Sequence, residues 1–83
     1  MRLVYFAWVR ETVGCGEETV SPPDAVRTLS DLADWLAKRG APYDSLFAAR
    51  ERLRLAVNQD YADWTTPVAA SDEVAIFPPV TGG

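Results

Sequence analysis

Residues 72–83 read DEVAIFPPVTGG, a short apolar run followed by two prolines and then by two glycines. The run over 73–77 predicts a β-strand, because β-branched and aromatic residues favour strands and alternate side chains face opposite sides. The two prolines cannot donate to a sheet ladder, so they predict an extended backbone that leaves the domain. Gly82 and Gly83 carry no Cβ, which lets the backbone enter a slot too narrow for other residues. The stretch therefore predicts a strand followed by an extended tail that ends on the Gly83 carboxylate.

The composition is that of a small acidic domain. The chain has 83 residues, a net charge of −4 and an apolar fraction of 48 %, which is ample for one modest core. One cysteine and no histidine exclude an internal disulfide and a Cys/His zinc cluster, so we expect a reducing, cytoplasmic setting. The basic residues are scattered, and no apolar run approaches the ~20 residues of a membrane span. We expect one domain over residues 1–77 with a tail at 78–83, and neither nucleic acid nor membrane as a partner.

Four further stretches predict strands, because they are short and rich in β-branched and aromatic residues. The first is residues 2–6. The stretch after it, 7–13, either extends this strand or forms a short helix, and the stop at Gly14 favours the helix. The other predicted strands are 17–21, which forms a hairpin with the first, 53–57, and 61–64 as a short edge strand.

The clearest helix is predicted over residues 28–39. Thr28 is a good N-cap, and Asp31 three residues later resembles a capping box. The apolar residues recur at helical spacing and form one stripe, made of Leu29, Leu32, Ala33 and Leu36. A shorter helical turn is expected within residues 43–52.

This order of elements predicts an α+β layer architecture. An N-terminal hairpin, one main helix and a C-terminal strand form the order of the β-grasp, or ubiquitin-like, fold. In that fold the first and last strands lie parallel at the centre of the sheet. We expect a mixed sheet of four to five strands with the main helix on one face.

The second face of this sheet is also predicted to be apolar. Alternation places Leu3 and Tyr5 towards the helix, whereas the opposite face carries Val4, Phe6, Ala75 and Phe77, together with Tyr61. An exposed apolar patch usually marks an interface, so we expect a protein partner there. The alternative is that loops, or the short helix with Trp8, cover this face.

No stretch contains the residues of a self-contained active site, since histidine and a phosphate-binding glycine loop are both absent. Cys15 lies between two glycines, without a histidine or clustered cations to activate it, and is interpreted as a turn residue. Four carboxylates are interpreted as turn and surface residues, and the arginines within 50–54 as a solvated face. The carboxylates are Asp60, Asp63, Asp72 and Glu73. The one group that suggests chemistry is the main-chain carboxylate of Gly83.

Three stretches resemble the small subunit of molybdopterin synthase, the sulfur carrier of molybdenum cofactor biosynthesis. They are residues 6–14 (FAWVRETVG), 55–59 (LAVNQ) and 72–83. The resemblance implies that an ATP-dependent, E1-like enzyme adenylates Gly83 and that a sulfur-donor protein turns it into a thiocarboxylate. The tail then enters the large synthase subunit and gives its sulfur to cyclic pyranopterin monophosphate. No cofactor would be bound permanently, and the catalytic side chains would belong to the partners.

The resemblance also implies roles for individual residues. The tail comprises Pro79, Val80, Thr81 and Gly82 next to the reactive Gly83, while Phe6, Tyr61 and Phe77 face the partner. Two alternatives stay open. The first is a ubiquitin-like carrier for thiamin or another sulfur pathway, or a protein modifier that forms isopeptide bonds. The second is a β-grasp binding module whose Gly-Gly end is incidental.

Overall fold

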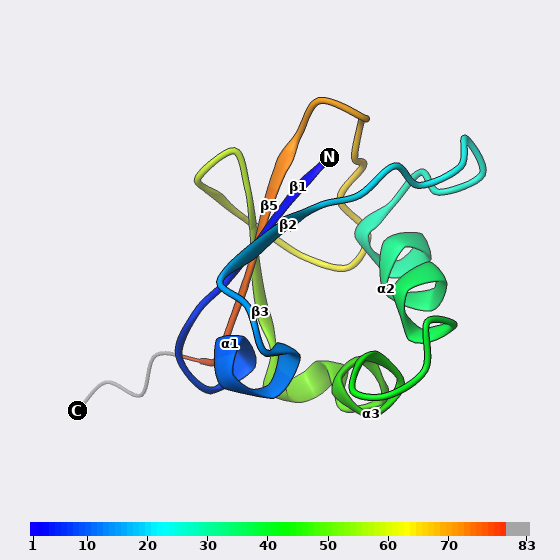
Figure 1. The fold of residues 1–83 in the computed structure, drawn as a ribbon. Helices are drawn as coiled ribbons and strands as arrows, with labels where there is room; N and C mark the ends of the chain where they lie inside the picture. The colour runs from blue at the N-terminus through cyan, green and yellow to red at the C-terminus, as the bar shows by residue number, and fades with distance from the viewer. Residues whose placement is uncertain (80–83) are drawn as a thin grey trace.

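The computed structural model describes residues 1–79 of the chain, in which a mixed sheet is flanked by helices (Figure 1). The predicted tail residues Val80, Thr81, Gly82 and Gly83 lie outside the described residues. Within residues 1–79, every helix is too short or too polar to reach across a lipid bilayer. In chain order the elements are β1 (Arg2–Tyr5), α1 (Ala7–Val13), β2 (Glu17–Thr19), α2 (Leu29–Ala37), α3 (Tyr43–Ala48), the 3₁₀ turn η1 (Arg50–Arg52), β3 (Arg54–Val57), β4 (Asp60–Ala62) and β5 (Glu73–Phe77).

The sheet has the strand order β2-β1-β5-β3-β4. β1 and β5 pair in parallel, with Leu3 opposite Val74 and Tyr5 opposite Ile76. The other neighbouring strands pair antiparallel. The first and last strands of the domain are therefore adjacent and lie inside the sheet, which confirms the predicted β-grasp fold.

Helix α2 packs its apolar stripe against one face of the sheet, and the four predicted stripe residues are all buried. The predicted capping box is present at its N-terminus. The Asp31 backbone N–H donates to Oγ1 of Thr28 at 3.1 Å, and the Thr28 N–H donates to the Asp31 carboxylate at 3.2 Å. Burial of each aliphatic side chain contributes about 1.5–3 kcal/mol, so packing rather than helix propensity holds α2 in place.

The core lies between the sheet and the helices α2 and α3. Helix α3 contributes the buried Leu46 and Phe47. The largest fully buried side chains come from the sheet and from helices α1 and α2: Leu3, Tyr5, Val9, Leu29, Leu32, Leu36, Val74 and Ile76. The alternation predicted for the central strands is confirmed, since Leu3, Tyr5, Val74 and Ile76 are no more than 1 % exposed.

Several predicted boundaries are wrong by one or two residues, for local reasons. β1 ends at Tyr5 because Phe6 is the N-cap of α1. The edge strand covers Asp60–Ala62 rather than 61–64, because the Asp63 carboxylate accepts from the Thr65 N–H at 2.8 Å and turns the chain. β2 ends two residues earlier than predicted, just ahead of the prolines at 22 and 23.

The helical interpretation of residues 7–13 is confirmed as α1, which ends at Gly14 with a φ of +92°. The helical turn expected within 43–52 is confirmed as α3 and η1. Trp8 of α1 packs against the buried core, and the Arg52 guanidinium lies over its ring at 5.1 Å. The alternative in which the helix with Trp8 covers the second sheet face is therefore wrong.

Candidate functional site

The second face of the sheet has one apolar row that runs across four strands. In the strand register Val4 is opposite Ala75, Ala75 is opposite Ala56, and Ala56 is opposite Tyr61. Val4 and Ala75 alternate with buried side chains that face α2, so these two residues and their cross-strand partners Ala56 and Tyr61 point away from the helices. The row confirms the predicted apolar face and adds Ala56, which the sequence interpretation left out.

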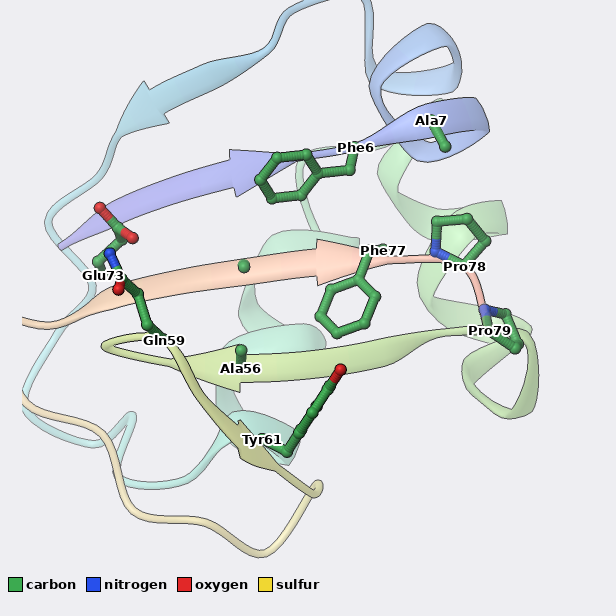
Figure 2. A pocket seen from close by; sticks show the side chains of 10 residues that line it. Phe6, Ala7, Ala56, Gln59, Tyr61, Glu73, Phe77, Pro78 and Pro79 are labelled. Atoms are coloured by element: carbon green, nitrogen blue, oxygen red, sulfur yellow. The ribbon is translucent and has the colours of Figure 1, made fainter. Parts of the chain in front are cut away.

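Two alanines in the middle of this row make a groove, because a methyl group leaves space that a larger side chain would fill. The open groove has a volume of about 710 Å³. Figure 2 shows the rings of Phe6, Tyr61 and Phe77 around this floor. We call this surface the docking groove, and define it by its lining residues Phe6, Ala7, Ala56, Gln59, Tyr61, Glu73, Ala75, Phe77, Pro78 and Pro79.

The aromatic walls of the docking groove are exposed to an unusual degree. Phe6 is 50 % exposed and Tyr61 is 85 % exposed, and these are the exposed large apolar side chains among residues 1–79. The structure thus brings together the three predicted partner-facing residues Phe6, Tyr61 and Phe77 around one groove. Aromatic residues are enriched in the cores of protein interfaces, so the arrangement suits a protein partner.

Phe6 is held in position by the junction between β1 and α1. Its N–H donates to the Ile76 carbonyl at 3.2 Å, and its own carbonyl accepts from the Val9 N–H at 3.1 Å. Ala7 then adopts a φ of +53°, a left-handed conformation that costs a non-glycine residue roughly 1 kcal/mol. This turn ends the strand after Tyr5 and leaves the Phe6 ring on the groove side of the sheet. Strain of this kind is often found where a side chain must be placed for function.

The predicted tail begins at the edge of the same groove. Pro78 and Pro79 follow β5 directly and line the end of the docking groove near Phe77 (Figure 2). A protein seated on the groove therefore lies next to the point from which the tail departs. The predicted boundary between domain and tail, at residues 77 and 78, coincides with the end of β5.

The carboxylates interpreted as turn residues have that role in the structure. Asp63 accepts hydrogen bonds from the Thr65 hydroxyl and N–H and from Thr66, which lowers the pKa of its carboxyl. Asp72 accepts from the Ala69 N–H at 2.7 Å and from the Asn58 amide at 3.0 Å. Among residues 1–79, no group of acidic, cysteine or histidine side chains is arranged to hold a metal ion. Cys15 is exposed in the turn after α1.

A polar cluster around Glu18 was missed by the sequence interpretation. Its carboxylate accepts from the Tyr5 hydroxyl at 2.8 Å, the Tyr43 hydroxyl at 3.0 Å and the Arg39 guanidinium at 2.8 Å. Burial alone would raise the pKa of Glu18, but these hydrogen bonds outweigh it and hold the pKa below its ordinary value. A signal was available in the sequence, because Glu18 is two residues from the apolar Val20 and alternation therefore places both on the same side of the strand predicted over 17–21. The cluster ties β2 to the helices and has no part in the docking groove.

Comparison with known proteins agrees with this geometry. A family model described as the ThiS family matches residues 3–83. The molybdopterin synthase sulfur carrier subunit of Escherichia coli is 38 % identical, over all of this chain and 99 % of its own length.

Two solved structures are similar to this chain over nearly all of its length. One is a putative molybdopterin converting factor, subunit 1, from Pyrococcus furiosus, with a TM-score of 0.75 and 27 % identity over 95 % of both chains. The other is the small archaeal modifier protein 1 of Haloferax volcanii, with a TM-score of 0.74 and 27 % identity over all of this chain and 98 % of that one.

Proposed function

Because this chain belongs to the ThiS family, we propose that it is the sulfur carrier subunit of a molybdopterin synthase. The observation that carries the proposal is the match to curated carrier subunits over the full length of the chain, up to its Gly-Gly end. The docking groove supports it, since a carrier needs a surface for its enzymes beside the root of the tail. We place this function in the cytoplasm.

The chemistry proposed for the chain takes place at Gly83. A carboxylate is a poor electrophile, so an E1-like enzyme uses ATP to form a glycyl adenylate and releases pyrophosphate. A sulfide equivalent from a sulfur-donor protein then displaces AMP and leaves a thiocarboxylate, which splits one difficult transfer into easier steps. The thiocarboxylate gives its sulfur to cyclic pyranopterin monophosphate and returns to the carboxylate, and two carriers would supply the two sulfurs of one dithiolene.

The protein part of this proposal is delivery. The side chains of the docking groove bind the large synthase subunit and, in another step, the activating enzyme. Pro78 and Pro79 direct the backbone away from β5, and Gly82 lets the end pass through a narrow entrance, because a Cβ there would clash. The catalytic side chains belong to the partners, and ATP is used by the activating enzyme rather than kept as a bound cofactor.

The test is the intact mass of the full chain after incubation with ATP, the activating enzyme and a sulfur donor. The proposal expects the exchange of one oxygen for one sulfur, located at Gly83 by fragmentation. A chain with Gly83 deleted is the control and should stay unmodified. An unchanged mass of the wild-type chain, under conditions that thiolate a known carrier, would overturn the proposal.

A second candidate function is a protein modifier, which the similarity to the small archaeal modifier protein 1 favours. In that role Gly83 forms an isopeptide bond with a lysine of a target protein. The same mass experiment separates the two functions when target proteins are included. A modifier gives a covalent adduct with the mass of the chain plus its target, whereas a carrier gives the sulfur exchange alone.

A further inference from the structure

The docking groove differs in charge between its two ends. At the end away from the tail, Arg2 forms ion pairs with Glu17 and with Glu73, the latter at 3.0 Å. One guanidinium against two carboxylates leaves a net charge of −1 at this end, which disfavours an acidic partner surface there. The end near the tail carries Arg54, and none of the ion pairs within residues 1–79 includes it.

Arg54 belongs to the same face as the groove. In the register of β3 and β5 it is directly opposite Phe77, and it alternates with the buried Leu55, as Ala56 does. Side chains that are directly opposite on antiparallel strands are close neighbours. Arg54 is exposed and is not itself a lining residue of the groove, but its register opposite the lining residue Phe77 places it at the rim, on the side where Pro78 follows β5.

The guanidinium of Arg54 is held in place by hydrogen bonds to the backbone. Its Nη1 donates to the carbonyl oxygens of Leu53 at 2.9 Å and Glu51 at 3.3 Å, which draws the side chain across the start of β3. A guanidinium held by one nitrogen keeps further N–H donors for a carboxylate, and its order reduces the entropy lost on binding.

We propose that Arg54 determines specificity on the docking groove by binding a carboxylate of the large synthase subunit. This inference rests on the proposed function. The carboxylate would stand next to the apolar side chain that the partner seats between Phe6 and Phe77. The chain as a whole has a net charge of −4, so an acidic partner surface is repelled overall, and Arg54 offers it an attractive contact beside the groove. The pair therefore selects one orientation of the partner, with its active site towards the tail.

The experiment measures the dissociation constant of the cognate large subunit at low and high salt, for the wild-type full chain, Arg54→Gln and Arg54→Glu. Loss of one charged hydrogen-bonded contact is expected to weaken binding about tenfold for Arg54→Gln, and more for Arg54→Glu. The difference should shrink at high salt, since rim charges are screened. Lys38→Glu is the matched control, because it makes the same charge change as Arg54→Glu. Lys38 is exposed at the C-terminal end of α2, which lies on the other face of the sheet from the groove, so this variant should leave the affinity unchanged.

Phe77→Ala in the same series separates the two proposals. If it weakens binding while both Arg54 variants bind like wild type at every salt concentration, the inference about Arg54 is wrong and the docking groove stands. If Phe77→Ala also binds like wild type, the groove is not the docking surface. If the Arg54 variants lose affinity for the activating enzyme alone, the assignment to the large subunit is overturned. Arg54→Lys, which keeps the charge but not the fork of donors, gives the same test should Arg54→Gln fold poorly.

Discussion

The rings of Tyr61 and Phe77 lie 6.2 Å apart, centroid to centroid, with their planes at 53° to each other. They come from strands that are not neighbours, because β3 runs between β4 and β5. Both rings stand on the open face of the sheet beside the methyl group of Ala56, the small side chain that β3 places opposite Tyr61 (Figure 2). The two rings thus form one wall of the docking groove, next to the small side chain of Ala56 in β3.

We expect Phe77→Ala and Phe6→Glu to weaken partner binding far more than they destabilise the fold. Both residues lie on the open face, and truncating an aromatic residue at the centre of an interface costs about 2 kcal/mol or more, roughly 30-fold in affinity. The measurements are the affinity for the large subunit and the melting temperature of the free chain. Leu32→Ala is the contrasting variant, since it is 2 % exposed and should lose about 2–5 kcal/mol of stability. A large loss of stability in Phe77→Ala with unchanged affinity would assign that ring to the core.

We expect Ala75→Leu to abolish tight binding while leaving the domain folded. The larger side chain fills the floor of the docking groove, where a partner side chain would otherwise sit, and it points away from the core. Affinity for the large subunit and thermal unfolding are compared with Ala48→Leu, an exposed alanine in α3. Equal affinity of Ala75→Leu and wild type would show that nothing enters the groove.

We expect Ala7→Gly to be stable, unlike most alanine-to-glycine changes at the start of a helix. Glycine removes the strain of the φ of +53°, roughly 1 kcal/mol, which offsets the similar entropy that glycine adds to the unfolded chain. Ala7→Val should lose more than 1 kcal/mol, since a β-branched residue tolerates this conformation poorly. Chemical denaturation of wild type, Ala7→Gly and Ala7→Val measures their order of stability. A marked loss of stability in Ala7→Gly would contradict the left-handed turn.

We expect the Glu18 cluster to make the stability of the fold depend on pH. The pKa of Glu18 is lower in the folded chain than in the unfolded one, so the unfolded chain binds more protons as pH falls. The stabilisation is therefore fully present above the unfolded value of about 4.3 and is lost as pH falls through the lower folded value. Denaturation of wild type and Glu18→Gln at neutral pH and below pH 4 measures this. The variant should be less stable than wild type at neutral pH, and the gap should close in acid.

Much of the fold was predictable from local pattern. The stripe of α2, its Thr28–Asp31 capping box and the alternation of β1 and β5 are all properties of neighbouring residues, and the structure has each of them. The boundaries that differ, at Phe6 and Asp63, depend on hydrogen bonds made by residues just beyond the strand. Phe6, Tyr61 and Phe77 were predicted as partner-facing, whereas Ala56 and Arg54 were not, because small and charged residues carry no signal until their cross-strand neighbours are known.

The sequence alone determined that this chain is a β-grasp domain, since the periodicity of its apolar residues and the prolines and glycines between them act over only a few positions. It also led to the proposal that the reactive group is the Gly83 carboxylate, because the two glycines without side chains at 82 and 83 are visible in the residues themselves. Only the tertiary structure decided that Phe6, Tyr61 and Phe77 surround one groove, with Arg54 beside Phe77. The physical reason is that β5 pairs with β1 and β3 across long stretches of chain, and no local pattern of residues encodes that register, whereas the β3–β4 register is local and is set by the tight turn at Asn58 and Gln59.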